Sequence, residues 1–143
     1  MSDACPFPAP KQYDRFDAVT YTPYPRNVPR ARHHVARLAV FWGLPALAAD
    51  AAPLTGELCT NALLHGCLRD RHFRMETSLR GTTLRIAVTD PRGERLPECR
   101  VAAEDEQFGR GLLIIRALAE RWAVERLAVG KTVWAELTPS PAP

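Results

Sequence analysis

Apolar residues recur at helical spacing in two neighbouring segments of the first half of the chain. The first segment lies between Asn27, a residue type that caps helix N-termini, and Gly43; its apolar positions are Val28, Ala31, Val35, Leu38 and Trp42. The second runs from about Leu47 to His65, and its apolar positions are Leu47, Ala51, Leu54, Leu58 and Ala62. This pattern predicts two amphipathic helices. Pro53 favours a start of the second helix near residues 50–53, because proline is best tolerated in a first turn.

Alternating apolar and polar positions predict strands on both sides of these helices. Residues 16–24 are rich in β-branched and aromatic types and form a candidate edge strand. Residues 72–79 and 84–89 are predicted to pair as a hairpin with its turn at Arg80-Gly81. Residues 122–129 and 132–137 are predicted to form a second hairpin with its turn at Gly130-Lys131. A further helix is expected from Leu112 to Arg121.

The order of these elements predicts the fold class. Helices are too few and too closely grouped to connect parallel strands one by one. We therefore expect an α/β (α+β) two-layer sandwich, with a mixed, mostly antiparallel sheet and the helices on one face. The proline-rich ends at residues 1–12 and 139–143 are predicted to be tails, so that one domain spans residues 13–138.

Composition narrows the class of protein. A chain of 143 residues with 46% hydrophobic and 24% charged residues can bury a core and is not typical of a disordered protein. Its longest uncharged stretch, residues 38–49, is well short of the roughly 20 residues that span a membrane. With no signal-peptide pattern, we expect a cytoplasmic protein whose cysteines are reduced thiols: Cys5, Cys59, Cys67 and Cys99.

Basic residues gather on the first predicted helix, although the net charge is only +3. They are Arg26, Arg30, Arg32, His33, His34 and Arg37. Because they flank an apolar stripe, we interpret them as the rim of a protein interface or as a solvated face. Binding of duplex DNA is the alternative, and it predicts a salt-sensitive gel shift.

Polar residues at three places are candidates for chemistry. Glu57 and Asn61 are four residues apart, so they project from one side of the second helix about 40° from each other. A carboxylate can act as a base and an amide oxygen as a metal ligand; a solvated helix shoulder is the structural alternative. Asp90 ends a strand, where it can accept a hydrogen bond from an exocyclic amine or begin a turn. Gly109 and Gly111 can let the backbone approach a phosphate or can form a hinge.

In chain order these pieces are E-x-x-x-N, D-x-x-G, G-x-G-L and G-K-T, spread from Glu57 to Thr132. This ordered set resembles the N, G1, G2 and G3 boxes of the GHKL ATPases. The segments ELCTNALLHG, VTDPRG, FGRGLLIIRALAERW and GKTVWAEL look like those of small single-domain anti-sigma-factor serine kinases. The resemblance covers Arg30 to Leu137 and implies the Bergerat-type ATP-binding fold.

The resemblance also implies roles for individual residues. Glu57 would be the general base, and Asn61 would hold Mg²⁺ against the phosphates of ATP. Asp90 would select adenine, with support from Thr132. The other implied nucleotide contacts are His65, Gly93, Gly109, Gly111 and Leu112, of which His65 is equally well interpreted as a structural residue at the end of a helix.

For partners, the resemblance implies a sigma factor, an anti-sigma-factor antagonist that is phosphorylated on serine, and a second copy of the chain in a homodimer. No contact with a membrane and no direct contact with nucleic acid are expected. Arg92 and Glu94 stand where the family's G1 box carries glycines. This departure favours the alternative of an ATP-binding regulatory module that transfers no phosphate.

Overall fold

The structure is a computed structural model and describes residues 13–65, 72–90, 113–127 and 130–140. Helices and strands follow the chain in the order β1 (Arg15–Tyr21), α1 (Asn27–Phe41), the 3-10 helix η2 (Pro45–Leu47), α2 (Ala48–His65), β2 (Phe73–Arg80), β3 (Thr83–Asp90), β4 (Arg121–Arg126) and β5 (Lys131–Leu137). Residues 113–118 are also helical. The predicted succession of helices and strands is confirmed.

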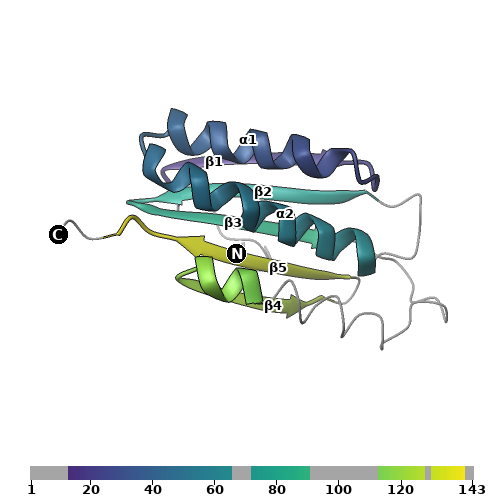
Figure 1. The fold of residues 1–143 in the computed structure, drawn as a ribbon. Coiled ribbons are helices and arrows are strands. Elements are labelled where there is room, and N and C mark those ends of the chain that lie inside the picture. Colours follow the sequence, from purple (N-terminus) through teal and green to yellow (C-terminus); the bar gives the residue numbers. More distant parts are fainter. Residues whose placement is uncertain (1–12, 66–71, 91–112, 128–129, 141–143) are drawn as a thin grey trace, which may run out of the picture.

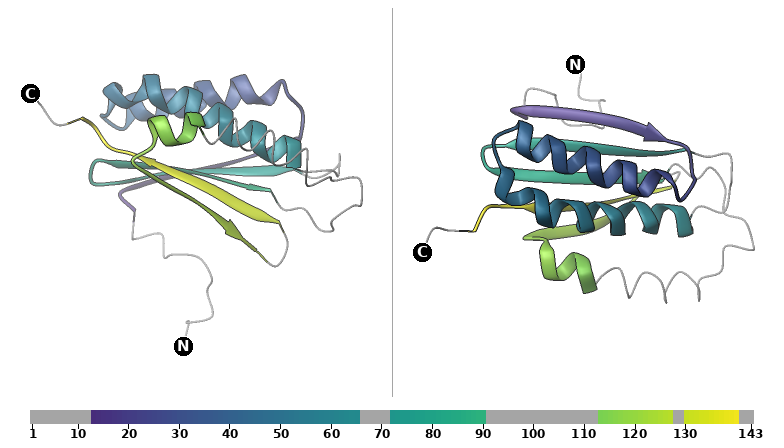
Figure 2. Two further views of the ribbon diagram at one scale, coloured as in Figure 1. Left: turned by 60° about the horizontal axis from the view of Figure 1, so that its bottom comes forward. Right: turned by 45° about the horizontal axis from the view of Figure 1, so that its top comes forward.

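The strands form one sheet in the order β1-β2-β3-β5-β4. Each described pairing is antiparallel, so the sheet is more uniform than the mixed sheet expected from the sequence. Both α1 and α2 cover one face of it, and the helical residues 113–118 lie on the same side (Figure 1 and Figure 2). This arrangement confirms the two-layer α/β sandwich.

The core lies between that face of the sheet and the helices. On α1 the buried side chains are small (Ala31, Val35 and Ala39), which lets α2 approach it closely. On α2 the larger Leu54 and Leu58 fill the space above the sheet. The sheet contributes Phe73, Met75, Leu84, Ile86, Val88, Val133, Ala135 and Leu137. Because strand residues alternate between the two faces of the sheet, these core positions show to which face each of the remaining strand residues points.

The opposite, helix-free face of the sheet carries a charged row that agrees with this register. Glu136 on β5 accepts from Arg85 on β3 and forms an ion pair with Arg121 on β4, each at 3.2 Å. The Arg85 guanidinium lies over the ring of Trp134 at 4.1 Å from its centroid. Even-numbered residues of β5 therefore point away from the helices.

The predicted role of Asn27 as a helix cap is wrong. Arg26 is the N-cap residue of α1, and it makes no side-chain capping bond. Asn27 lies in the first turn instead, where its Nδ2 donates to the carbonyl oxygen and to Oγ1 of Thr22, at 2.9 and 2.7 Å. The Nδ2 of this amide thus ties α1 to the connection after β1, while its Oδ1 accepts from Arg30 of the same helix at 3.4 Å.

Pro53 does not mark the start of α2. The helix begins at Ala48, directly after η2, and continues through Pro53. A proline this near the start of a helix removes a single backbone hydrogen bond, the one that would reach the carbonyl of Ala49. Burial of the apolar stripe outweighs that loss.

The second hairpin turns earlier in the sequence than predicted. Lys131 is the first residue of β5 and pairs with Arg126, so the connection occupies residues 127–130 rather than Gly130-Lys131. The Leu127 amide donates to the carbonyl of Gly130 at 3.0 Å, and Gly130 has a φ of 87° that favours glycine. Arg121, expected at the end of a helix, is the first residue of β4.

Candidate functional site

The C-terminal half of α2 carries a buried amide. Asn61 is 7% exposed, and neither its Oδ1 nor its Nδ2 has a hydrogen-bond partner among the described residues. A buried amide without partners costs about 1–3 kcal/mol, so such groups are rare unless a ligand or ion satisfies them. Asn61 is therefore suited to hold a group that the described residues do not supply.

Glu57 lies one helical turn before Asn61 and on the same side of α2. Its side chain is of intermediate exposure, and no ion pair of its carboxylate occurs among the described residues. A carboxylate in this position is accessible to a substrate and is not neutralised by a neighbouring cation. The helix thus brings together a candidate base and a candidate metal ligand, as the sequence predicted.

Gly56 lets an arginine of α1 cross α2 at close range. A Cβ at Gly56 would lie 3.1 Å from Cδ and 3.6 Å from Nε of Arg32, so only glycine leaves this path open at its present width. Arg32 was expected in a basic cluster, and its contact with α2 was not predicted. A glycine at position 56, inside the second predicted helix, is the sequence feature that could have indicated a close contact there.

Asp90 is the last residue of β3 and is buried at 4% exposure. It shares its face with Val88, so its side chain lies on the side of the sheet that α2 covers. Figure 1 and Figure 2 show the C-terminal half of α2, the end of β3 and the start of β5 at the same end of the domain. The fold brings Asp90 to the end of the molecule that also carries Glu57 and Asn61.

Thr132 does not lie beside Asp90. It pairs with Thr89, and the two hydroxyls form a hydrogen bond of 2.7 Å on the helix-free face. The residue opposite Asp90 is Lys131, which is also 4% exposed. Lys131 was not among the predicted site residues, because the sequence pattern assigns it to the turn rather than to the strand that pairs with β3.

Five predicted contacts fall outside what the structure describes. The side chain of His65, the last residue of α2, is one of them; the others are Gly93, Gly109, Gly111 and Leu112. Their nucleotide contacts stay predictions.

The thiol of Cys59 faces the core rather than this candidate site. Burial raises the pKa of Cys59 from its ordinary 9.0 to about 12, so the thiol stays protonated and is a poor metal ligand. Burial, with smaller effects of Cys59 and Asp17, also raises the pKa of Tyr21 at the end of β1. Cys59 therefore belongs to the packed core and not to the chemistry.

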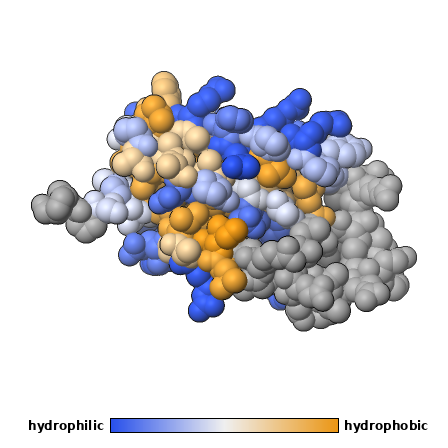
Figure 3. Space-filling model, viewed as in Figure 1, coloured by the Kyte–Doolittle hydropathy of each residue, from blue (hydrophilic) through white to orange (hydrophobic). Residues whose placement is uncertain are grey.

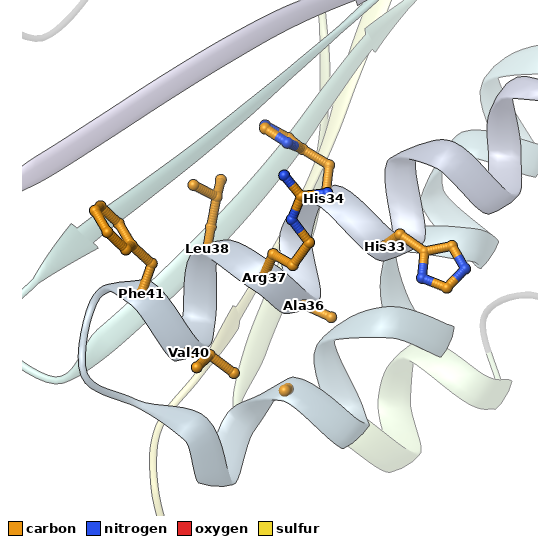
Figure 4. Close-up of a pocket in the computed structure, with 8 residues that line it drawn as sticks. His33, His34, Ala36, Arg37, Leu38, Val40 and Phe41 are labelled. Atoms are coloured by element: carbon orange, nitrogen blue, oxygen red, sulfur yellow. The ribbon is translucent and has the colours of Figure 1, made fainter.

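A separate hollow of about 570 Å³ lies against α1 (Figure 4). Its lining combines basic residues with apolar ones: His33, His34, Ala36, Arg37, Leu38, Val40, Phe41 and Ala48. Phe41 is 83% exposed, an unusual position for a large apolar side chain. Ala48 opens α2, so this hollow lies at the other end of that helix from Asn61.

Apolar side chains are also exposed where the helical residues 113–118 lie. Leu113 and Ile114 are the exposed members, and the space-filling view shows apolar surface over this segment (Figure 3). Ile115, next along the helix, is buried in the core. Leu118 also packs against the core, so the segment is anchored by Ile115 and Leu118 and presents Leu113 and Ile114 outward.

None of the helices in the described residues is long and apolar enough to cross a membrane. No curated protein that was compared with the chain matches it. The model of one family does match, over residues 21–137, which include α1, α2 and β2 to β5. The chain belongs to the histidine kinase-like ATPase domain family, which indicates a site for ATP.

Proposed function

We propose that this protein is an ATP-dependent serine kinase that acts as an anti-sigma factor: it binds a sigma factor and phosphorylates an anti-sigma-factor antagonist. The family identity supports ATP binding. The observation that carries the catalytic part of the proposal is the pair on α2, the accessible carboxylate of Glu57 one turn from the unpartnered amide of Asn61.

The donor atoms at Asn61 fit a magnesium–nucleotide complex. Mg²⁺ prefers oxygen ligands, and it is held by one or two protein groups together with substrate phosphates. Oδ1 of Asn61 is buried and has no partner among the described residues, so it can serve as such a ligand without giving up a bond to any of them. When bound, the metal would neutralise charge on the triphosphate.

Glu57 is the proposed general base. Its carboxylate would accept the proton of a serine hydroxyl as the hydroxyl oxygen attacks the γ-phosphorus and ADP leaves. Phosphoryl transfer needs mainly positioning, charge neutralisation and such a base. The intermediate exposure of Glu57 supports this role, because a protein substrate has to reach the carboxylate.

Asp90 is the proposed contact for the base of the nucleotide. Its buried carboxylate can accept a hydrogen bond from the exocyclic amine of adenine. The basic and apolar surface of α1 is the proposed contact for protein partners, including a second copy of the chain. Exposed Phe41 and Val40 beside Arg37 support an interface there.

The decisive experiment separates ATP binding from phosphate transfer. The full chain is titrated with ATP and Mg²⁺ by calorimetry, and it is then incubated with labelled ATP and candidate antagonist proteins. Glu57→Ala should bind ATP as the unaltered protein does and should transfer no phosphate to serine. Asn61→Ala should weaken binding itself.

Asp50→Ala is the matched control, because Asp50 is an exposed acid in the first turn of the same helix. It should change neither measurement. Undiminished transfer by Glu57→Ala would refute the proposed base. ATP binding without transfer by the unaltered protein would favour a regulatory module that changes shape with nucleotide, the alternative suggested by Arg92 and Glu94 in the G1 box.

A further inference from the structure

The hollow on the second half of α1 has the apolar part of a docking site (Figure 4). Its apolar lining includes Val40, which is 55% exposed, and Phe41, which is 83% exposed. Large apolar side chains that are exposed next to each other are typical of protein interfaces, and phenylalanine is enriched in such contacts. A partner that covers this part of α1 would remove both side chains from water.

Basic side chains follow the same side of the helix. His33, Arg37 and Val40 are four and three residues apart, so they form one stripe along α1. Arg37 is exposed, and its guanidinium makes no ion pair among the residues that the structure describes. A cation of this kind, next to an apolar contact, is available to a carboxylate of a partner.

The charge of α1 has one sign. Its 15 residues include three arginines and two histidines, but no aspartate or glutamate. Among the described ion pairs, the one that reaches α1 joins His34 to Asp17 of β1 at 2.7 Å. That pair leaves the charge of Arg37 uncompensated. The hollow is therefore complementary to a surface that carries carboxylates.

A second copy of the chain does not fit the hollow. In a two-fold symmetric contact a patch faces itself, so Arg37 and His33 would meet the same basic residues of the other copy. Opposed like charges are unfavourable at an interface. Contact of α1 with a second copy is therefore expected outside the hollow. Nucleic acid fits no better, because phosphates would leave Val40 and Phe41 without an apolar partner.

We propose that the hollow on α1 binds an acidic amphipathic helix of a partner protein. The apolar side of that helix covers Val40 and Phe41, and a carboxylate at its edge pairs with Arg37. A helix suits the site because the stripe on α1 follows helical spacing, and helices pack side by side with such stripes in contact.

This inference rests on the proposed function in one respect, since it takes α1 as the surface that meets protein partners. The hollow includes Ala48, the first residue of α2, whereas Asn61 lies in the C-terminal half of that helix. A partner helix in the hollow therefore leaves the candidate nucleotide site uncovered.

The test uses three labelled, stapled helical peptides of about 14 residues, or four turns. Each carries leucines at helical spacing, and its flanking positions are all glutamate, all glutamine or all lysine. Fluorescence anisotropy measures their binding to the full chain. The glutamate peptide should bind about tenfold more tightly than the glutamine peptide, and the lysine peptide should not bind. Added salt should weaken the glutamate peptide most.

Two variants locate the bound peptide. Arg37→Gln should weaken the glutamate peptide about tenfold and change the glutamine peptide little, because the ion pair with the guanidinium requires a carboxylate. Phe41→Ala should weaken both peptides, because it removes the largest exposed apolar side chain of the hollow. Arg80→Gln and Leu113→Ala are the matched controls, since both residues are exposed and neither lines the hollow. They should change no affinity.

Several results would overturn the inference. One is a glutamate peptide that does not bind, or that binds no more tightly than the glutamine peptide. Another is unchanged affinity in folded Arg37→Gln and Phe41→Ala proteins, since the peptide would then lie elsewhere. Dissociation of a dimer by Phe41→Ala in sedimentation would show that a second copy covers the hollow. Binding to phosphatidylserine vesicles that Arg37→Gln removes, with no peptide bound, would assign the hollow to a membrane.

The measurements also separate this inference from the function on which it rests. Peptide binding is measured without nucleotide, so failure of the unaltered protein to bind Mg-ATP contradicts the proposed function alone. If Phe41→Ala fails to fold, the peptide series and Arg37→Gln still decide.

Discussion

His34 of α1 and Asp17 of β1 lie 2.7 Å apart, Nε2 to Oδ2, and join the edge strand to the first helix. Their side chains are 29% and 28% exposed, so solvent screens the contact only in part. The pair fixes the position of α1 above β1. It also holds His34 in place at the rim of the hollow on α1.

Asp17→Ala should destabilise the protein by about 0.5–1.5 kcal/mol, because it removes a partly buried, charge-assisted hydrogen bond. Urea unfolding measures the loss. Glu76→Ala is the control: Glu76 pairs with Arg74 at 2.8 Å within one strand, and those side chains are more exposed. The control should cost less, and an equal cost would show that the link from β1 to α1 adds nothing special.

Asn61→Leu should raise the melting temperature of the nucleotide-free protein and remove ATP binding. The substitution replaces an unpartnered buried amide by an apolar side chain of similar size, which relieves about 1–3 kcal/mol of desolvation cost. Thermal unfolding and calorimetry with Mg-ATP measure the two effects.

Thr55→Val is the matched control for that experiment. Thr55 lies on the same helix, is fully buried and has an Oγ1 with no hydrogen-bond partner in the part of the chain that the structure describes. It should also stabilise the protein, yet ATP binding should persist. A marked destabilisation by Asn61→Leu would mean that the amide has a structural role that the described contacts do not include.

The periodic spacing of apolar residues was sufficient to predict individual helices and strands. The apolar stripe of α2 predicted the helix on which Glu57 and Asn61 share one side, and the alternation in β3 predicted the strand that ends at Asp90. Both features follow from local spacing. The two-layer architecture followed from the order of the elements.

Contacts that depend on how the strands pair could not be predicted from local spacing in the same way. Gly130-Lys131 has the composition of a hairpin turn, but pairing of Lys131 with Arg126 moves the turn, and it places Lys131 rather than Thr132 beside Asp90. The capping role of Asn27 failed for a related reason, since Thr22 offers its amide a better partner outside the helix. The predicted glycine lid lies outside the described residues, so it stays a prediction.

Stability should fall as the pH rises from about 9 toward 12, partly because of Cys59. Its pKa is raised from 9.0 to about 12 on folding, so between these values the folded state holds a proton that the unfolded state releases. The stability that this difference contributes is fully present below pH 9 and is lost as the pH rises through the folded pKa, by up to about 1.4 kcal/mol per unit. The partly buried phenol of Tyr21, whose pKa is also raised, contributes in the same direction.

Comparison with Cys59→Ala removes the thiol together with its smaller effect on the pKa of Tyr21, whereas the larger effect of burial on Tyr21 stays in both proteins. Urea unfolding of each at about pH 8 and about pH 10.5 gives two differences in the free energy of unfolding. The variant should be less stable at the lower pH because of its cavity, and the gap should narrow at the higher pH. A gap that stays constant would contradict the shifted pKa.

Gly56→Ala should have two opposing effects on the stability of the protein, and one of them depends on Arg32. Alanine in a helix interior is about 0.5–1 kcal/mol more favourable than glycine, but the new Cβ would lie 3.1 Å from Cδ of Arg32. Arg32 is an exposed, flexible side chain and can move by the few tenths of an ångström required. We therefore expect a small net gain, below the full helix-propensity value.

The Arg32→Ala background reveals how much of that gain the contact cancels. Without the arginine stem, Gly56→Ala should stabilise the protein by the full amount of about 1 kcal/mol, because nothing opposes the new methyl group. Free energies of unfolding of the unaltered protein, both single variants and the double variant complete the cycle. Equal effects of Gly56→Ala in the two backgrounds would mean that Arg32 does not pack over residue 56 in solution.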